Sequence, residues 1–177
     1  MMVRYRRNFL AASAITLTLR DRRSRILIDH VGLLRESFRA ARQRHPFAID
    51  AIIVLPEHLH MIVTMPPSDA GYDTRIRFLK SCFSRRLKQS GVPVHRNERG
   101  EYDLWQRRYW EHTIRDDDDL QRHVDYIHFN PVKHGHALRA ADWPHSSIHR
   151  YIRFGWMNQD WAFEAGDVRA VYGESTT

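Results

Sequence analysis

The chain has 177 residues, of which 42% are hydrophobic, and 28 Lys and Arg against 21 Asp and Glu give it a formal net charge of +7. This length and composition predict one globular domain with a sizeable core and exclude a disordered or low-complexity chain. The single cysteine, Cys82, can form neither an internal disulfide nor a cysteine-based zinc site, which excludes the zinc-finger classes. We therefore expect a soluble, basic protein of a reducing compartment, the cytoplasm.

The N-terminal residues raise one alternative to a cytoplasmic protein. Arg4, Arg6 and Arg7 precede an apolar stretch, residues 9–19, in the order found in secretory signal peptides. The stretch runs directly into the charged residues 20–23, where a cleavage site would need small side chains. We therefore interpret it as a strand. No apolar run approaches the roughly 20 residues that a membrane-spanning helix needs, so we expect no membrane partner.

The positive charge is concentrated in two blocks. Residues 1–48 carry 11 basic and 3 acidic side chains, residues 74–115 carry 11 and 4, and each of the two remaining segments has a net charge of −4. Of the 28 basic residues 25 are Arg, the side chain suited to bidentate contacts with phosphate and to stacking on bases. The blocks favour a nucleic-acid partner, and the alternative is a solvated arginine-rich surface.

The first half of the chain alternates helix and strand patterns. Apolar residues spaced four and three apart over residues 27–41 predict an amphipathic helix. Residues 47–55 and 59–65 are apolar runs rich in Ile and Val, and the break at Pro56 between them predicts two adjacent strands joined by a tight turn. A second helical pattern, residues 76–87, is heavily basic and ends with Gly91 in the C′ position.

The segment 92–115 has little periodicity and predicts a short strand with flanking loops. Trp105 and Trp110 stand there beside Arg107 and Arg108. Aromatic rings stack on bases and arginines hold phosphates, so this segment is a candidate nucleic-acid contact. The alternative is that both Trp side chains belong to the core.

A third helix follows four aspartates, residues 116–119, whose carboxylates are suited to capping its N-terminus. We expect this helix to end near Phe129, because the residue before Pro131 is disfavoured in the helical region. Residues 145–152 predict a further short helix within a tail. The order of elements predicts an α+β fold: a ferredoxin-like antiparallel sheet with helices packed on one face, plus a C-terminal extension.

Two histidines, His58 and His60, stand two residues apart at the start of a predicted strand and therefore face the same side of it. They can present two nitrogens to one divalent cation, although such a pair is also expected by chance among 12 histidines. Tyr126 and Asn130 are four residues apart and share a helix face. The Asn130 amide oxygen can complete a mixed nitrogen and oxygen site for Mg²⁺ or Mn²⁺.

The alternative for Tyr126 is an ordinary core tyrosine. His123 and His128, on the same predicted helix, are interpreted as surface residues or as residues that support the site.

Four segments carry a combined signature: LPEHLHMIVTMP, WQRRYWEHTIR, HVDYIHFNPVKHG and DWPHSSIHRYI. The combination resembles the HUH single-tyrosine transposases and, within them, the REP-associated tyrosine transposases of bacteria. The resemblance covers nearly the whole chain. It implies a transposase domain over residues 1–142, with a C-terminal tail, residues 143–177, that packs on or near the active site.

The resemblance also assigns roles to the candidate residues. It implies that His58, His60 and Asn130 bind the metal ion and that Tyr126 attacks a phosphodiester, forming a covalent 5′-phosphotyrosine and releasing a 3′ hydroxyl. Such an enzyme nicks and rejoins single-stranded DNA next to a hairpin or repetitive palindrome. The alternatives are a DNA-binding regulator with degraded catalysis and a metal-dependent hydrolase.

The expected DNA contacts are arginines from both basic blocks: Arg4, Arg6, Arg7, Arg20, Arg22, Arg23, Arg75, Arg85, Arg107 and Arg108. Insertion-sequence relatives exchange helices in dimers. The added tail favours a monomer, and the dimer is the alternative.

Overall fold

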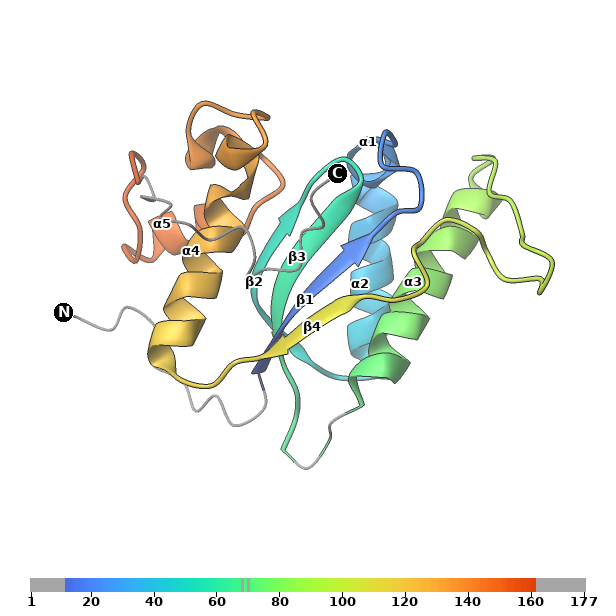
Figure 1. Ribbon diagram of the computed structural model, residues 1–177, viewed down its shortest axis with the longest axis horizontal. Helices are drawn as coiled ribbons and strands as arrows, with labels where there is room; N and C mark the ends of the chain where they lie inside the picture. Colours follow the sequence, from blue (N-terminus) through green and yellow to red (C-terminus); the bar gives the residue numbers. More distant parts are fainter. Residues whose placement is uncertain (1–11, 68, 70, 162–177) are drawn as a thin grey trace.

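The computed structural model describes residues 12–67, 69 and 71–161, and it is built around a four-stranded sheet (Figure 1). The strands are β1 (Ala12–Thr18), β2 (Ala48–Val54), β3 (His58–Thr64) and β4 (Trp110–Thr113). They lie in the order β2-β3-β1-β4, and every neighbouring pair is antiparallel. With helices between β1 and β2 and between β3 and β4, this is the ferredoxin-like arrangement that the sequence predicts.

The helices cover both faces of the sheet (Figure 1). They are α1 (Ile26–Asp29), α2 (Val31–Arg44), α3 (Tyr72–Gln89), α4 (Asp117–Lys133), the short 3₁₀ helix η1 (Ala140–Asp142) and α5 (Ile148–Arg153). The α2 and α3 helices lie on one face, and α4 with α5 lies on the other. Among the described residues, no helix has the length and apolar character needed to cross a membrane.

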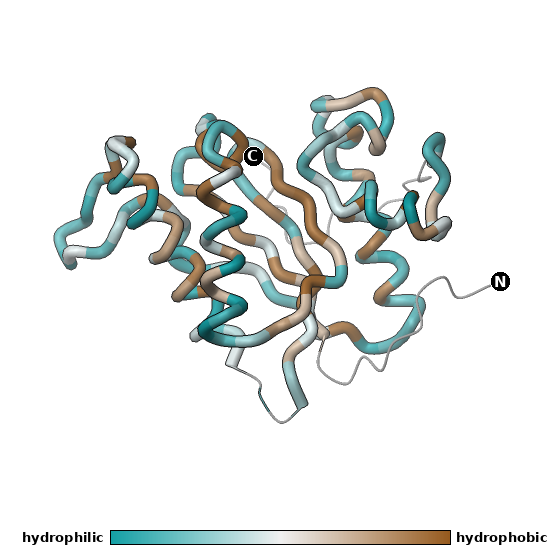
Figure 2. Tube along the Cα trace, turned by 180° about the vertical axis from the view of Figure 1, so that it is seen from behind, coloured by the Kyte–Doolittle hydropathy of each residue, from teal (hydrophilic) through white to brown (hydrophobic). Residues whose placement is uncertain are grey.

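The prediction that helices pack on one face only is therefore wrong. β1 is buried along its whole length, as are the first six residues of β3, and a strand buried on both sides needs cover on both sides. Ile15 and Met61 pack with Phe83 on the α2 and α3 side. Ile62 packs with Val124 on the α4 side. Hydrophobic residues accordingly gather along the strands between the two helical layers (Figure 2).

The helix predicted over residues 27–41 is present but is divided at His30 into α1 and α2. His30 has φ −119° and ψ 34°, outside the helical region. Leu27 is fully buried, and its N–H donates to the Pro56 carbonyl oxygen at 3.3 Å. The first helical turn is therefore tied to the turn between β2 and β3, next to the candidate histidines.

The helix α4 begins as predicted and ends later than predicted. Asp116 is its N-cap, and the Asp116 carboxylate accepts a hydrogen bond from the Asp119 N–H at 2.8 Å. The prediction of an end near Phe129 is wrong, because the helix continues through Pro131 to Lys133. A proline removes only its own N–H donor, and here the next turn closes through the His134 N–H to the Asn130 carbonyl oxygen at 3.0 Å.

The C-terminal extension packs against the outer edge of β2. The Val54 N–H donates to the His145 carbonyl oxygen at 2.8 Å, and the Trp143 indole N–H donates to the Val54 carbonyl oxygen at 2.8 Å. Residues 143–161 thus continue the fold beside the sheet, with α5 at the place of the predicted short helix. The remainder of the predicted tail, residues 162–177, lies outside the described residues.

Candidate active site

The two candidate histidines come from β3 and face α4. Both are buried, and their ring centroids are 4.9 Å apart. His60 lies opposite Thr16 of β1, and its Nδ1 is 2.7 Å from the Thr16 hydroxyl oxygen. His58 Nδ1 is 2.9 Å from a carboxylate oxygen of Glu57. Because each Nδ1 is held by a protein oxygen, each Nε2 is the nitrogen suited to bind a metal ion.

Glu57 orients His58 and remains ionised. Burial opposes the ionisation of this carboxyl group, but the hydrogen bond and the charge of His58 outweigh burial and lower the pKa of Glu57. Arg22, 3.6 Å away, lowers the pKa further. A carboxylate that accepts the Nδ1 proton of an imidazole fixes the tautomer in which Nε2 carries the lone pair.

One stripe of α4 lies over this histidine pair. The Tyr126 ring is 5.7 Å from the His60 ring, and the His134 ring is 5.4 Å from the His58 ring. Asn130 is four residues from each of Tyr126 and His134, so it lies on the same stripe between them. The structure therefore brings the four predicted site residues, His58, His60, Tyr126 and Asn130, together.

The predicted metal ligands also fit a cation by their hydrogen bonding. Asn130 is fully buried, and its amide nitrogen donates to the Tyr126 carbonyl oxygen at 3.3 Å. The Asn130 amide oxygen and His58 Nε2 are buried and have no hydrogen-bond partner among the described residues. Buried polar atoms without partners are costly, and a bound cation would satisfy both.

Lys133 is a site residue that the sequence analysis missed. Its ammonium group donates to the Tyr126 phenol oxygen at 2.8 Å and lies 4.8 Å from the centre of the Tyr126 ring. The two residues are seven apart, which places them on one helix face. This seven-residue spacing is visible in the sequence. The predicted helix, however, ends near Phe129 and leaves Lys133 outside it.

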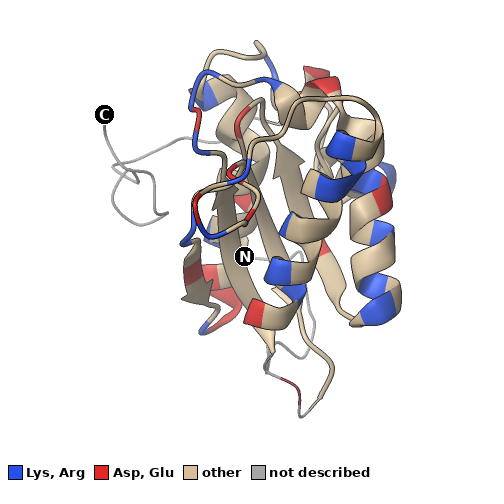
Figure 3. Ribbon diagram, turned by 90° about the vertical axis from the view of Figure 1, so that its right-hand side faces the viewer, with Lys and Arg blue, Asp and Glu red and all other residues tan. Residues whose placement is uncertain are grey.

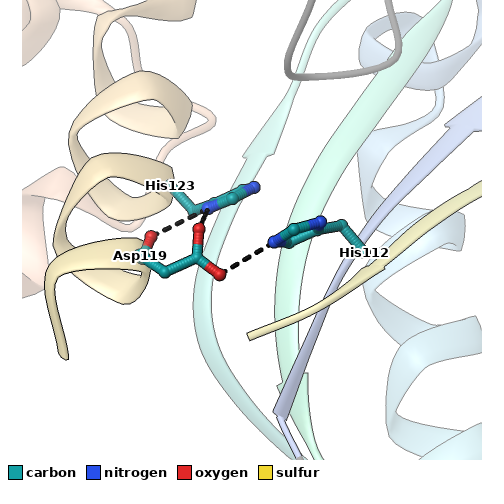
Figure 4. A group of neighbouring side chains, drawn as sticks. All are labelled: His112, Asp119 and His123. Carbon is teal, nitrogen blue, oxygen red and sulfur yellow. Dashed lines mark hydrogen bonds and ion pairs between the residues drawn. The ribbon is translucent and has the colours of Figure 1, made fainter. Parts of the chain in front are cut away.

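His123 and His128 are buried, so of the two interpretations given for them the surface position is wrong, and a supporting role is left. His128 Nε2 is 2.9 Å from the Ser147 hydroxyl oxygen, and burial lowers the pKa of His128 to about 3. It therefore joins α4 to the C-terminal extension as a neutral ring. His123 instead contacts Asp119 and faces His112 of β4 (Figure 4).

A basic groove lies on the other side of the sheet, between α3 and the segment that precedes β4. Its volume is about 1210 Å³, and it is lined by seven Lys or Arg side chains and three Asp or Glu side chains. The seven basic residues are Arg20, Arg77, Lys80, Arg85, Arg96, Arg99 and Arg107. Figure 3 shows Lys and Arg residues along the helices on this side of the molecule.

The structure brings three of the predicted DNA-contacting arginines, Arg20, Arg85 and Arg107, together in this groove. Arg22 lies apart from them, beside Glu57 of the candidate active site. Arg23 and Arg108 are exposed elsewhere. The predicted residues Arg4, Arg6 and Arg7 lie outside the described residues.

Arg75 is not arranged as a phosphate contact, and this prediction is corrected. Only 4% of the residue is exposed. Its guanidinium group donates to the Asp69 carboxylate at 2.6 Å and to the Pro46 carbonyl oxygen at 2.9 Å. The arginine fixes the start of α3 and has no surface to offer to DNA.

Comparison with known proteins agrees with this geometry. A family model described as "Transposase IS200 like" matches residues 2–130. A Haemophilus influenzae protein named for the REP-associated tyrosine transposases is 39% identical over 164 residues, which cover 90% of this chain and 93% of that protein. The REP-associated tyrosine transposase of Escherichia coli K12 is 37% identical over 171 residues, 96% of each chain. This chain belongs to the REP-associated tyrosine transposases.

The fold supports the same assignment. A solved structure described as a REP-associated tyrosine transposase bound to a REP hairpin matches with a TM-score of 0.82 and 36% identity, over 98% of each chain. As a tyrosine transposase, the chain is a DNA-nicking and strand-transfer enzyme. HUH transposases generally use a divalent metal ion.

Proposed function

We propose that this transposase nicks and rejoins single-stranded DNA next to a hairpin, through a covalent 5′-phosphotyrosine at Tyr126. The observation that carries the proposal is the convergence of Tyr126 with the buried His58 and His60, each with Nδ1 held by a protein oxygen. His58, His60 and Asn130 would hold Mg²⁺ or Mn²⁺. When bound, such an ion supplies positive charge beside the scissile phosphate.

Lys133 prepares the nucleophile. A phenol with a pKa of about 10 is a weak nucleophile at neutral pH, and its phenolate is a strong one. The ammonium group of Lys133, 2.8 Å from the phenol oxygen, stabilises that phenolate and keeps the oxygen in place. The phenol proton passes to solvent.

The cleavage step exchanges one phosphate ester for another. The Tyr126 oxygen bonds to phosphorus while the bond from phosphorus to the 3′ oxygen breaks, and that oxygen takes a proton to become a 3′ hydroxyl. In the reverse step a 3′ hydroxyl gives up its proton, attacks the phosphotyrosine and releases Tyr126. The phosphodiester energy is retained in the covalent intermediate, so rejoining needs no external energy source.

The basic groove is proposed to hold the DNA backbone. Arg85 and Arg107 are exposed and line it from opposite sides, α3 and the segment before β4. The Tyr102 ring also lines the groove, with the Arg96 guanidinium 4.5 Å from its centre. Arginines with an adjacent aromatic ring suit phosphates and stacked bases.

The monomer is proposed as the working unit. Tyr126 of α4 contacts His60 of β3 in the same chain, so the nucleophile and the candidate metal ligands need no second copy. Light scattering coupled to size exclusion should give the mass of one chain, and a dimer mass would contradict this proposal.

The function is tested with a labelled single-stranded oligonucleotide that carries a hairpin, in the presence of Mn²⁺. We expect a protein–DNA adduct that survives denaturation, and its loss in Tyr126→Phe with DNA binding retained. The matched control, Tyr72→Phe in α3, outside both the groove and the candidate active site, should keep the adduct. Product without an adduct would support the hydrolase, and binding without product would support the regulator. An adduct in Tyr126→Phe would overturn the assignment.

A further inference from the structure

A second histidine cluster lies at the N-terminal end of α4 (Figure 4). Asp119 and His123 come from α4, and His112 comes from β4. His112 Nε2 is 2.8 Å from one Asp119 carboxylate oxygen, and His123 Nδ1 is 3.3 Å from the other and 2.8 Å from the Asp119 backbone carbonyl oxygen. One ligand atom from each of the three residues lies within 4.8 Å of the others.

The three side chains are close enough to converge on one small transition-metal ion, which would replace the hydrogen bonds that His112 and His123 make to Asp119. Two imidazole nitrogens and a carboxylate oxygen form a donor set typical of zinc, which takes tetrahedral ligands at about 2.0–2.1 Å. Ligands on such a tetrahedron are about 3.3 Å apart. Asp119 and His123 are four residues apart on one helix face, the spacing that the helical zinc motif uses for its two histidines. The third ligand, His112, arrives from the neighbouring strand.

The electrostatics of the cluster also suit a cation. Asp119 is 2% exposed. Burial opposes its ionisation, but the hydrogen bonds from His112 and from the Arg115 N–H lower its pKa, so it is a carboxylate. Burial lowers the pKa of His123, which favours a neutral imidazole.

The cluster is separate from the histidine pair of β3. In the sheet, Thr16 of β1 pairs with His60 of β3 on one side and with Trp110 of β4 on the other. His112 is two residues further along β4. The Trp110 ring stacks on this cluster, 5.8 Å from the His112 ring and 6.3 Å from the His123 ring. The side chain of His112 is 23% exposed, which gives an ion a path from solvent.

We propose that His112, Asp119 and His123 bind a divalent transition metal of the zinc class, with water in the remaining position. The ion would join the edge strand β4 to the first turn of α4, the helix that also carries Tyr126. This site is a positioning device for α4, and its existence does not depend on the chemistry proposed for Tyr126.

The test is zinc binding by the full chain, measured by metal analysis after equilibrium dialysis against a competing chelator. The variant His58→Ala/His60→Ala removes the candidate catalytic ligands and should still bind one zinc ion. Adding His112→Ala to that variant should weaken zinc affinity at least about 100-fold, since supporting residues alone contribute 10–100-fold. Adding His95→Ala, an exposed histidine outside the cluster, should change nothing.

A second readout covers variants that fold poorly. Co²⁺ should give a visible absorption band of a nitrogen-ligated site in His58→Ala/His60→Ala, and zinc should raise the thermal midpoint of that variant. Loss of zinc binding in His58→Ala/His60→Ala with its circular dichroism unchanged would overturn the proposal. Zinc binding unaffected by His112→Ala would overturn it as well.

Discussion

The two faces of the sheet differ in the burial of their polar side chains. On the α4 side the polar groups are buried and point inward, and those of His58 and Asn130 include atoms without a partner among the described residues. On the α3 side the basic groups of Arg85 and Arg107 are exposed and line an open groove. The residues proposed to cut DNA and the charges proposed to hold it are therefore separated by the thickness of the sheet.

The largest expected effect comes from the metal ligands on the α4 side. His60→Ala should reduce cleavage below detection, because it removes a ligand next to Tyr126, while DNA affinity stays within about twofold because phosphate contacts dominate it. Single-turnover cleavage and filter binding measure the two quantities. A parallel loss of affinity would show that the two sides are not independent.

Lys133→Met should lower the cleavage rate by about 10²–10⁴-fold, because the Tyr126 phenol then loses its proton less readily. Lys133→Arg should recover part of that rate because it restores the charge. DNA affinity should change little. If Lys133→Met cleaves at the rate of the unchanged enzyme, the 2.8 Å contact with Tyr126 has no catalytic role.

Substitutions in the basic groove should change DNA affinity and leave the cleavage step intact. Arg85→Gln/Arg107→Gln should weaken DNA binding about tenfold and reduce the slope of log affinity against log salt by about 0.7–0.9 per lost contact. Cleavage of already bound DNA should be unaffected. Arg39→Gln, an exposed arginine of α2 outside the groove, is the control. An equal loss in Arg39→Gln would mean that net charge, not the groove, binds the DNA.

The smallest effect concerns pH. Burial lowers the pKa of Lys80, in the groove, to about 8. Its ammonium group is charged below that pH and loses its charge as the pH rises through it, so DNA affinity should fall a few-fold between pH 7 and pH 9. Lys80→Arg stays charged and should flatten this profile. Fluorescence anisotropy at constant ionic strength measures both, and identical profiles would exclude Lys80 as the titrating group.

Local patterns were sufficient to predict much of this fold and part of the site. Strand periodicity placed His58 and His60 on one face, and helix periodicity placed Tyr126 and Asn130 on one stripe, because both pairs depend only on the repeat of their own element. The N-cap at Asp116 was likewise a local signal.

The remaining features depend on how particular side chains meet in the folded chain, which the repeat of a helix or strand does not show. Lys133 was missed because proline usually ends a helix, and the predicted helix therefore stops before Pro131. In the structure the helix continues to Lys133 with one backbone hydrogen bond lost at Pro131. The contact between His112 and Asp119 depends on how the chain turns between β4 and α4, which the period of neither element shows. The burial of Arg75 follows from its partner Asp69, and a count of charges does not reveal it.

The pairing of the C-terminal extension with β2 also covers the outer edge of the sheet. An outer strand with bare backbone groups is a template for another chain, and folded proteins cover or interrupt such strands. Here the Ile52 carbonyl oxygen accepts from the Ser147 N–H, and the Val54 N–H donates to His145. Removing the extension would uncover an apolar strand, so we expect a chain shortened to residues 1–142 to aggregate before any loss of catalysis could be measured.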